Sequence, residues 1–166
     1  MPASVCRISN DEGDVLRRSR LAALKESPSA FGSSYEAEAQ QTAEEWSERA
    51  RAGATGSVRS TFFALVDDRV VGLVGGYRSD PEDTTVQLVS MWCAPEVRRT
   101  GVSRALMTAV IDWAAATSAS SVDLWVTIGN QPAFALYKSF GFHETGDHQP
   151  LPSDPSKDEI RMRLPL

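Results

Sequence analysis

The segment Asn130–Phe142, NQPAFALYKSFGF, contains the signals of a short helix from its first turn to its last. Asn130 is suited to cap the helix, and Pro132 falls in the first turn, where a missing backbone N–H is harmless. Gly141 ends the helix before the chain enters the next strand. The segment therefore predicts a helix over Asn130–Phe140.

A second segment, Arg98–Ser103 (RRTGVS), lies between a predicted strand and a strongly amphipathic helix that opens at Gly101. A helix start leaves backbone N–H groups unpaired and carries partial positive charge, and a glycine there lets an anion approach closely. The arginines add charge. The segment indicates a site for a small polyanion such as a diphosphate, although an ordinary loop with solvated arginines explains it equally well. It matches neither G-x-x-x-x-G-K-[ST] nor G-x-G-x-x-G.

The remaining elements follow from the spacing of apolar residues and from turn residues. Three consecutive strands precede the Gly101 helix, which excludes a strict alternation of strands and helices and predicts a mixed sheet. The expected strands are Cys6–Ser9, Thr61–Val66, Val70–Arg78, Thr84–Cys93, Val122–Ile128, one starting at Gly141-Phe142, and Asp158–Leu164. The other expected helices run from Asp14 to Ser27-Pro28 and over Glu36–Arg51, and His148–Lys157 is expected to be a loop.

Composition limits the class of protein. A chain of 166 residues with 42% hydrophobic residues suits a single domain, 1–166, with a real core. Its net charge is −5, and its only tight basic cluster is Arg98, Arg99 and Arg104, so we expect no nucleic-acid binding. No stretch has the apolar length of a membrane span, and Cys6 and Cys93 show no disulfide or metal-site spacing. We therefore expect a cytoplasmic protein with two reduced thiols, no membrane association and no metal.

Taken together, the two segments resemble the GNAT superfamily of N-acetyltransferases, which use acetyl-coenzyme A (acetyl-CoA). Met91–Ser103 is similar to the family's strand and its Q/R-x-x-G-x-G/A pyrophosphate turn, and Asn130–Phe142 to its N-x-x-A-x-x-L-Y-x-x-x-G-F segment. The second motif matches at every position. The first departs once, because Ser103 stands where the family usually has Gly or Ala. The resemblance spans about Thr61–Phe142.

The resemblance implies an α/β (mixed α+β) fold. Its central, twisted, mostly antiparallel mixed sheet splays between Thr84–Cys93 and Val122–Ile128, and helices cover both faces. It implies acetyl-CoA as co-substrate, with pantetheine in the gap and the diphosphate on the backbone of Arg99–Arg104. The residues that it assigns to the cofactor are Met91, Trp92, Cys93, Arg98, Arg99, Thr100, Gly101, Val102, Ser103, Arg104, Asn130, Ala133 and Tyr137.

The resemblance also implies direct attack of an amine on the thioester, the acceptor being a primary amine of a small molecule or of a peptide or protein. Tyr137 is assigned as the catalytic acid that protonates the leaving thiolate, and a phenol near pKa 10 is chemically suited to this role. A backbone N–H of Trp92 or Cys93 is the expected oxyanion donor. The alternative for Tyr137 is a packed core aromatic.

The acceptor site is less defined by sequence. Phe31 and Tyr35, in the loop after the first helix, are expected to form its wall, although a packed turn explains them as well. Glu36, His143 and His148 are candidates for a general base with nothing to separate them. The negative net charge is compatible with cationic amines.

The open alternative to an enzyme is a non-catalytic acyl-CoA-binding module that senses or regulates. Homodimers are common in the family, although the sequence marks no interface.

Overall fold

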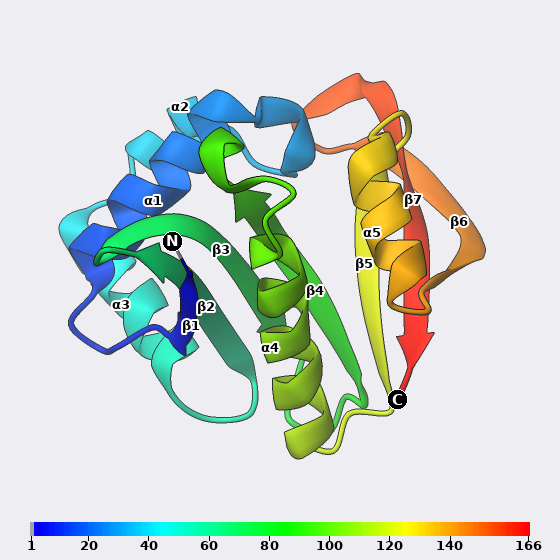
Figure 1. Cartoon of the computed structure of the whole chain (residues 1–166), viewed down its shortest axis with the longest axis horizontal. Helices are drawn as coiled ribbons and strands as arrows, with labels where there is room; N and C mark the ends of the chain where they lie inside the picture. Colours follow the sequence, from blue (N-terminus) through cyan, green and yellow to red (C-terminus); the bar gives the residue numbers. More distant parts are fainter. Residues whose placement is uncertain (1) are drawn as a thin grey trace.

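The computed structural model describes residues 2–166, and its seven strands form one sheet in the order β1-β2-β3-β4-β5-β7-β6 (Figure 1). Neighbouring strands are antiparallel except β4 and β5, which are parallel. This is the mixed, mostly antiparallel sheet that the sequence predicts. The strands are β1 (Ser4–Arg7), β2 (Arg59–Val66), β3 (Arg69–Tyr77), β4 (Thr85–Cys93), β5 (Ser121–Thr127), β6 (His143–Leu151) and β7 (Asp154–Pro165).

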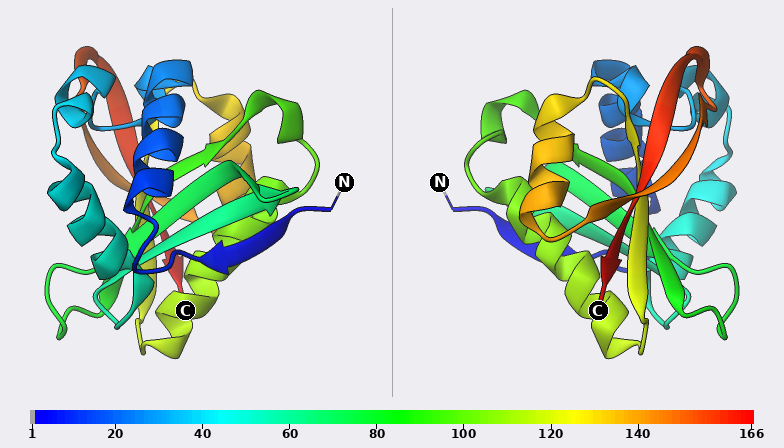
Figure 2. Two further views of the ribbon diagram at one scale, coloured as in Figure 1. Left: turned by 90° about the vertical axis from the view of Figure 1, so that its left-hand side faces the viewer. Right: turned by 90° about the vertical axis from the view of Figure 1, so that its right-hand side faces the viewer.

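Helices cover both faces of this sheet (Figure 2). One layer packs on β2 and β3 through α1 and α3, and α4 packs on β1–β4 from the other side, where α5 also lies. The helices are α1 (Gly13–Glu26), α2 (Tyr35–Ala39), α3 (Ala43–Ala54), α4 (Val102–Ala116) and α5 (Gln131–Ser139), with short 3-10 turns η1 (Pro28–Ala30) and η2 (Pro95–Val97).

Two glycines of β3 let α4 lie close to the sheet. A Cβ on Gly72 would fall 2.9 Å from Leu106 Cδ1, and one on Gly76 would fall 3.1 Å from both Val110 and Trp113. Side chains at these two positions would push α4 away from β3, so the sequence GLVGG fixes the distance between sheet and helix.

The sheet opens between β4 and β5. Their parallel pairing covers only Thr85–Gln87 against Ser121–Asp123, and beyond it the strands diverge, with α4 on the β4 side of the gap and α5 on the β5 side (Figure 1). A bulge accompanies the divergence: Trp92 is opposite Leu73 and Val89 is opposite Gly75, so β4 has one residue more than β3 between these pairs. Ser90, in the bulge, has φ 62°. The splay predicted between these two strands is therefore confirmed.

Two predicted elements differ from the structure. The helix expected over Glu36–Arg51 is two helices, because Thr42 caps α3 by a capping box with Glu45 and so interrupts the first one. The loop expected over His148–Lys157 is mostly the β6–β7 hairpin. Pro150 is tolerated there because β6 is an edge strand and needs no further ladder partner.

Candidate active site

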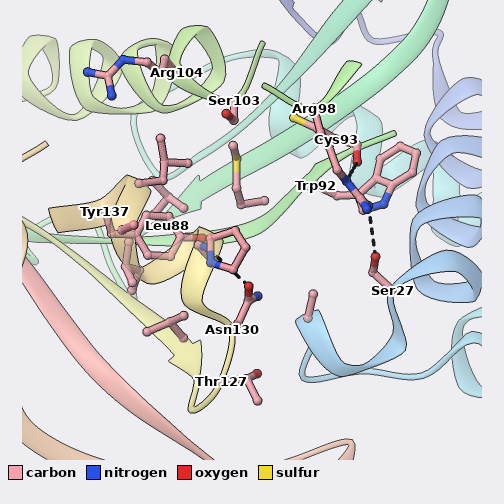
Figure 3. A pocket seen from close by; sticks show the side chains of 18 of the residues that line it. Ser27, Leu88, Trp92, Cys93, Arg98, Ser103, Arg104, Thr127, Asn130 and Tyr137 are labelled. Carbon is pink, nitrogen blue, oxygen red and sulfur yellow. Dashed lines mark hydrogen bonds between the residues drawn. The ribbon is translucent and has the colours of Figure 1, made fainter. Parts of the chain in front are cut away.

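A cavity of about 860 Å³ occupies the gap between the diverging strands β4 and β5 (Figure 3). Its walls come from β4, β5, the start of α4 and one face of α5. Of the residues assigned to the cofactor, all but two line this cavity: Met91, Trp92, Cys93, Arg98, Arg99, Gly101, Ser103, Arg104, Asn130, Ala133 and Tyr137. Thr100 and Val102 do not line it: the Thr100 hydroxyl donates to Val97 O, and Val102, the first residue of α4, is buried in the core.

The N-terminus of α4 forms one end of the cavity. Gly101 precedes the helix with φ 94°, and no side chain caps it. The N–H of Ala105 donates to Gly101 O at 3.1 Å, so the N–H groups of Val102, Ser103 and Arg104 have no acceptor within the helix. Unpaired donors, the helix dipole and nearby arginines together form an anion-binding surface.

The three arginines of the basic cluster have different surroundings. Arg98 Nη2 donates to Glu26 at 2.7 Å and its Nε donates to the carbonyl of Cys93 at 3.1 Å. Arg104 Nη1 donates to Ser139 Oγ at 2.8 Å, which links α4 to α5. Arg99, at φ 63°, is exposed and makes no side-chain hydrogen bond among residues 2–166. Arg99 and Arg104 are therefore better placed than Arg98 to meet a phosphate.

Glu26, at the end of α1, joins the helix to β4. Its carboxylate accepts hydrogen bonds from Trp92 Nε1 at 2.9 Å and from Arg98. Burial raises the pKa of Glu26, but hydrogen bonds from Ser27, Trp92 and Arg98 outweigh it and bring that pKa below its usual value. A charged Glu26 thus fixes the orientation of Arg98 and Trp92 at the edge of the cavity.

Tyr137 reaches the cavity from α5. Its ring packs against Phe142 with centroids 6.1 Å apart, and its side chain is buried. Among residues 2–166 its hydroxyl makes no hydrogen bond, which leaves it available for a ligand. Burial, assisted by Cys93, raises the pKa of Tyr137 well above its usual value, so the phenol stays protonated.

Asn130 and Cys93 also line this cavity. The Asn130 side chain accepts a hydrogen bond from the backbone of Ala133 at 3.4 Å and caps α5, as the sequence predicts. Cys93 lies across the cavity from α5, and burial raises the pKa of its thiol to about 11 even though Arg98 lowers it. A thiolate is therefore disfavoured in this cavity.

The residues expected on the acceptor side are not in either cavity. Phe31 is 3% exposed and lies beneath the Arg20 guanidinium, 4.7 Å from it, so it is a packed residue of the turn and not an exposed wall. Tyr35 is exposed and lines neither cavity. The candidate bases Glu36, His143 and His148 are exposed and line neither cavity.

Sequence reasoning missed a buried polar cluster behind the β4 bulge. Arg20 on α1 donates to both oxygens of Glu38, at 2.9 and 3.0 Å, and to Ser90 Oγ at 2.7 Å. Hydrogen bonds from Arg20 and charge from Arg49 lower the pKa of Glu38 despite burial, which by itself raises it. These residues are 18 and 70 positions apart, so no local pattern signals the contact.

Among residues 2–166, no helix is long and apolar enough to cross a membrane, and no three His, Cys, Asp or Glu side chains gather as a metal site would require.

Known proteins share both the fold and part of the sequence. The GNAT-family acetyltransferase of Streptococcus pneumoniae superposes with TM-score 0.78 and 18% identity, over 99% of this chain and 100% of that one. Spermidine N-acetyltransferase of Vibrio cholerae, solved with CoA and spermine, superposes with TM-score 0.76 and 17% identity, over 98% and 95% of the two chains.

In sequence, the human N-acetylaspartate synthetase is 37% identical over 91 residues, which cover 54% of this chain and 30% of that protein. The chain thus corresponds to about a third of this relative's length. The acetyltransferase (GNAT) family matches residues 21–142, from within α1 to the end of the α5 motif. The chain therefore belongs to the acetyltransferase (GNAT) family, a family of acetyl-CoA-dependent N-acetyltransferases.

Proposed function

We propose that this chain transfers an acetyl group from acetyl-CoA to a primary amine of a small molecule or of a peptide or protein. The observation that carries the proposal is one cavity that combines an uncapped helix N-terminus with the hydroxyl of a buried tyrosine that makes no hydrogen bond within residues 2–166. Acetyl-CoA would supply the acetyl group as a thioester: the neutral amine nitrogen bonds to the acetyl carbon and releases one proton to water, the C–S bond breaks, and the sulfur gains a proton and leaves as the thiol.

The residues of the cavity suit the two ends of acetyl-CoA. The N–H groups of Val102, Ser103 and Arg104 would bind the diphosphate, with charge from Arg99. Beyond Gln87 the β5 side of β4 has no strand partner, so the backbone there can hydrogen-bond a pantetheine amide as a strand would. The residues therefore fit this co-substrate along the length of the cavity.

The proposed proton transfer to the leaving sulfur depends on the burial of Cys93 and Tyr137. Burial raises the pKa of the Cys93 thiol to about 11, and a leaving thiolate in the same place meets the same penalty. Tyr137 carries a proton at neutral pH and would donate it to that sulfur. We assign to Tyr137 the role of general acid. The backbone of the β4 bulge, near Trp92 and Cys93, would supply an oxyanion donor.

The acceptor would enter from the opposite face of the sheet. A second cavity, between α1, α3 and strands β2–β4, meets the first at Val89 and Ser90. Relatives named for N-acetylaspartate and for spermidine differ in the charge of their acceptors, so the family alone leaves the acceptor open.

The proposal is tested by thiol release from acetyl-CoA in the presence of a broad amine panel, with the acetylated product identified by mass spectrometry. Tyr137→Phe should lower kcat about 100-fold or more while the Kd for CoA stays unchanged. Tyr77→Phe, which removes a hydroxyl on β3 outside both cavities, is the matched control.

Tight binding of CoA without turnover on the whole panel would refute the proposal and favour a non-catalytic acyl-CoA-binding module. An unchanged kcat for Tyr137→Phe between pH 6 and 9 would remove the assigned acid role.

A further inference from the structure

The second cavity, of about 520 Å³, is lined by residues of α1, α3 and strands β2–β4. Helices α1 and α3 cover this face of the sheet (Figure 2). The floor of the cavity is formed by β3 and β4, and it reaches the β4 bulge at Ser90, which also borders the cofactor cavity. A ligand in the second cavity would therefore approach the bulge from the side opposite α4. Its charged residues decide what that ligand can be.

Positive charge exceeds negative charge at the inner end. Arg20 and Arg49 both line the cavity, and both pair with the one carboxylate of Glu38. Each nitrogen of the Arg20 guanidinium already donates a hydrogen bond, two of them to Glu38 and one to Ser90. One guanidinium charge in this inner group is therefore left without a counter-charge.

Arg49 has guanidinium N–H groups that make no hydrogen bond within residues 2–166. Its Nη1 donates to Glu38 at 3.3 Å and to Gln41 at 3.1 Å, while its Nε and Nη2 make no hydrogen bond among residues 2–166. Its guanidinium lies 4.5 Å from the Trp46 ring, which holds the side chain in place. Burial lowers the pKa of Arg49, as do the charges of Arg20 and Arg59, against the effect of Glu38. A bound anion would offset these repulsions.

The other carboxylates of the cavity do not cancel this excess. Glu45 lies at the rim and accepts the Thr42 backbone N–H at 2.7 Å as part of the helix cap. Glu48 is exposed, and Arg59, which is also exposed, lines the same outer part. The outer part is thus close to neutral or negative, and the inner part is positive.

We infer that the second cavity is the acceptor site and that it takes an amine with a carboxylate close to its nitrogen, such as a free amino acid. The inference rests on the proposed function. The carboxylate pairs with the free donors of Arg49, and the amine lies at the bulge beside Ser90. An acceptor with only positive charges, such as a polyamine, would place an ammonium against Arg49.

The test compares amino acids with their α-amides as acceptors. Free acids should have a KM about tenfold or more below that of the amides, since the amides lack the charged hydrogen bonds. Arg49→Gln should raise the KM of the acids about tenfold or more, leaving the KM of the amides, the KM of acetyl-CoA and kcat within about twofold. Arg51→Gln, an exposed arginine on the same helix, is the matched control.

Arg49→Lys should recover part of the preference, because it restores the charge without the planar donors. If Arg49→Gln does not fold, Arg59→Gln serves as the second variant, with a smaller rise in KM for the acids only. Amides whose KM is equal to or lower than that of the acids, or an Arg49→Gln effect equal for acids and amides, would overturn the inference.

Calorimetry on the CoA-loaded protein separates this inference from the proposed function. If no amine is acetylated, yet free amino acids bind the wild type and fail to bind Arg49→Gln, the acceptor site stands and the transferase does not. If amines are acetylated without regard to a carboxylate, the transferase stands and the acceptor class is wrong. If amino acids do not bind at all, the inference fails.

Discussion

Glu38 is the single carboxylate that neutralises Arg20 in the interior, so Glu38→Gln should destabilise the protein strongly. The side chains of Arg20 and Glu38 are only 8% and 7% exposed, which leaves little solvent to screen an unpaired charge. Removing one partner of a buried ion pair costs about 3–5 kcal/mol, a large share of a total stability of about 5–15 kcal/mol. For a chain of this size the loss corresponds to a fall in Tm of roughly 6–20 °C.

Urea and thermal unfolding at pH 7, followed by circular dichroism, measure this loss. Glu44→Gln is the matched control, because Glu44 pairs with Arg51 on the surface with side chains 74% and 50% exposed. That control should change the free energy of unfolding by less than about 0.5 kcal/mol. A Glu38→Gln protein within about 1 kcal/mol of wild type would refute the reasoning.

The same pair gives a pH dependence of known sign. Arg20 and Arg49 bring the pKa of Glu38 below its usual value, although burial opposes them. The stabilisation is therefore complete above the unfolded pKa, about 4.3, and is lost as pH falls through the lower folded pKa. The stability difference between wild type and Glu38→Gln should shrink at acid pH. A difference that grows on acidification would contradict the assignment.

Three further predictions concern the cofactor cavity. Gly101→Val and Gly56→Val place a branched side chain at φ 94° and 85°, so each variant should lose about 1–2 kcal/mol of stability. Only Gly101→Val should weaken CoA binding. Equal Kd values for CoA in both variants would contradict the site at the start of α4. Cys93, with a pKa raised by burial to about 11, should react with iodoacetamide more slowly than exposed Cys6, and CoA should slow it further, as followed by mass spectrometry. Arg99→Gln should weaken CoA binding more at low than at high salt, as measured by calorimetry; an effect independent of salt would remove Arg99 from the diphosphate site.

Local signals in the sequence predict the parts of the site that depend on single elements. The cap at Asn130, the end of α5 at Gly141 and the glycine before α4 each follow from residues a few positions apart. Once α4 and α5 flank a splayed sheet, their predicted faces meet in one cavity, which is what the structure shows.

The cluster behind the bulge depends on contacts that no local pattern contains. Arg20, Glu38 and Ser90 come from α1, α2 and β4, and only the packed fold brings them together. The net charge of −5 is equally uninformative here, because it describes the whole surface, while the inner end of the second cavity has a surplus of arginine. The carboxylate that we infer for the acceptor therefore could not be predicted from the net charge.

Some misplaced elements had signals in the sequence. Thr42 and Glu45 match the S/T-x-x-E capping box, which marks the start of α3 within the expected single helix. Phe31 is expected to be exposed because it lies in a loop, but the Arg20 guanidinium covers its ring. Pro150 favours a loop in the sequence, because no local pattern shows that it lies on an edge strand. Its place at the edge follows only from the order of the strands in the sheet.

A crystal structure with bound CoA tests the central claim most directly. We expect the diphosphate of CoA within hydrogen-bond distance of the backbone N–H groups of Val102, Ser103 and Arg104. We expect the thiol of CoA beside the Tyr137 hydroxyl. A diphosphate bound elsewhere, or a thiol that ends away from Tyr137 and the β4 bulge, would contradict this claim.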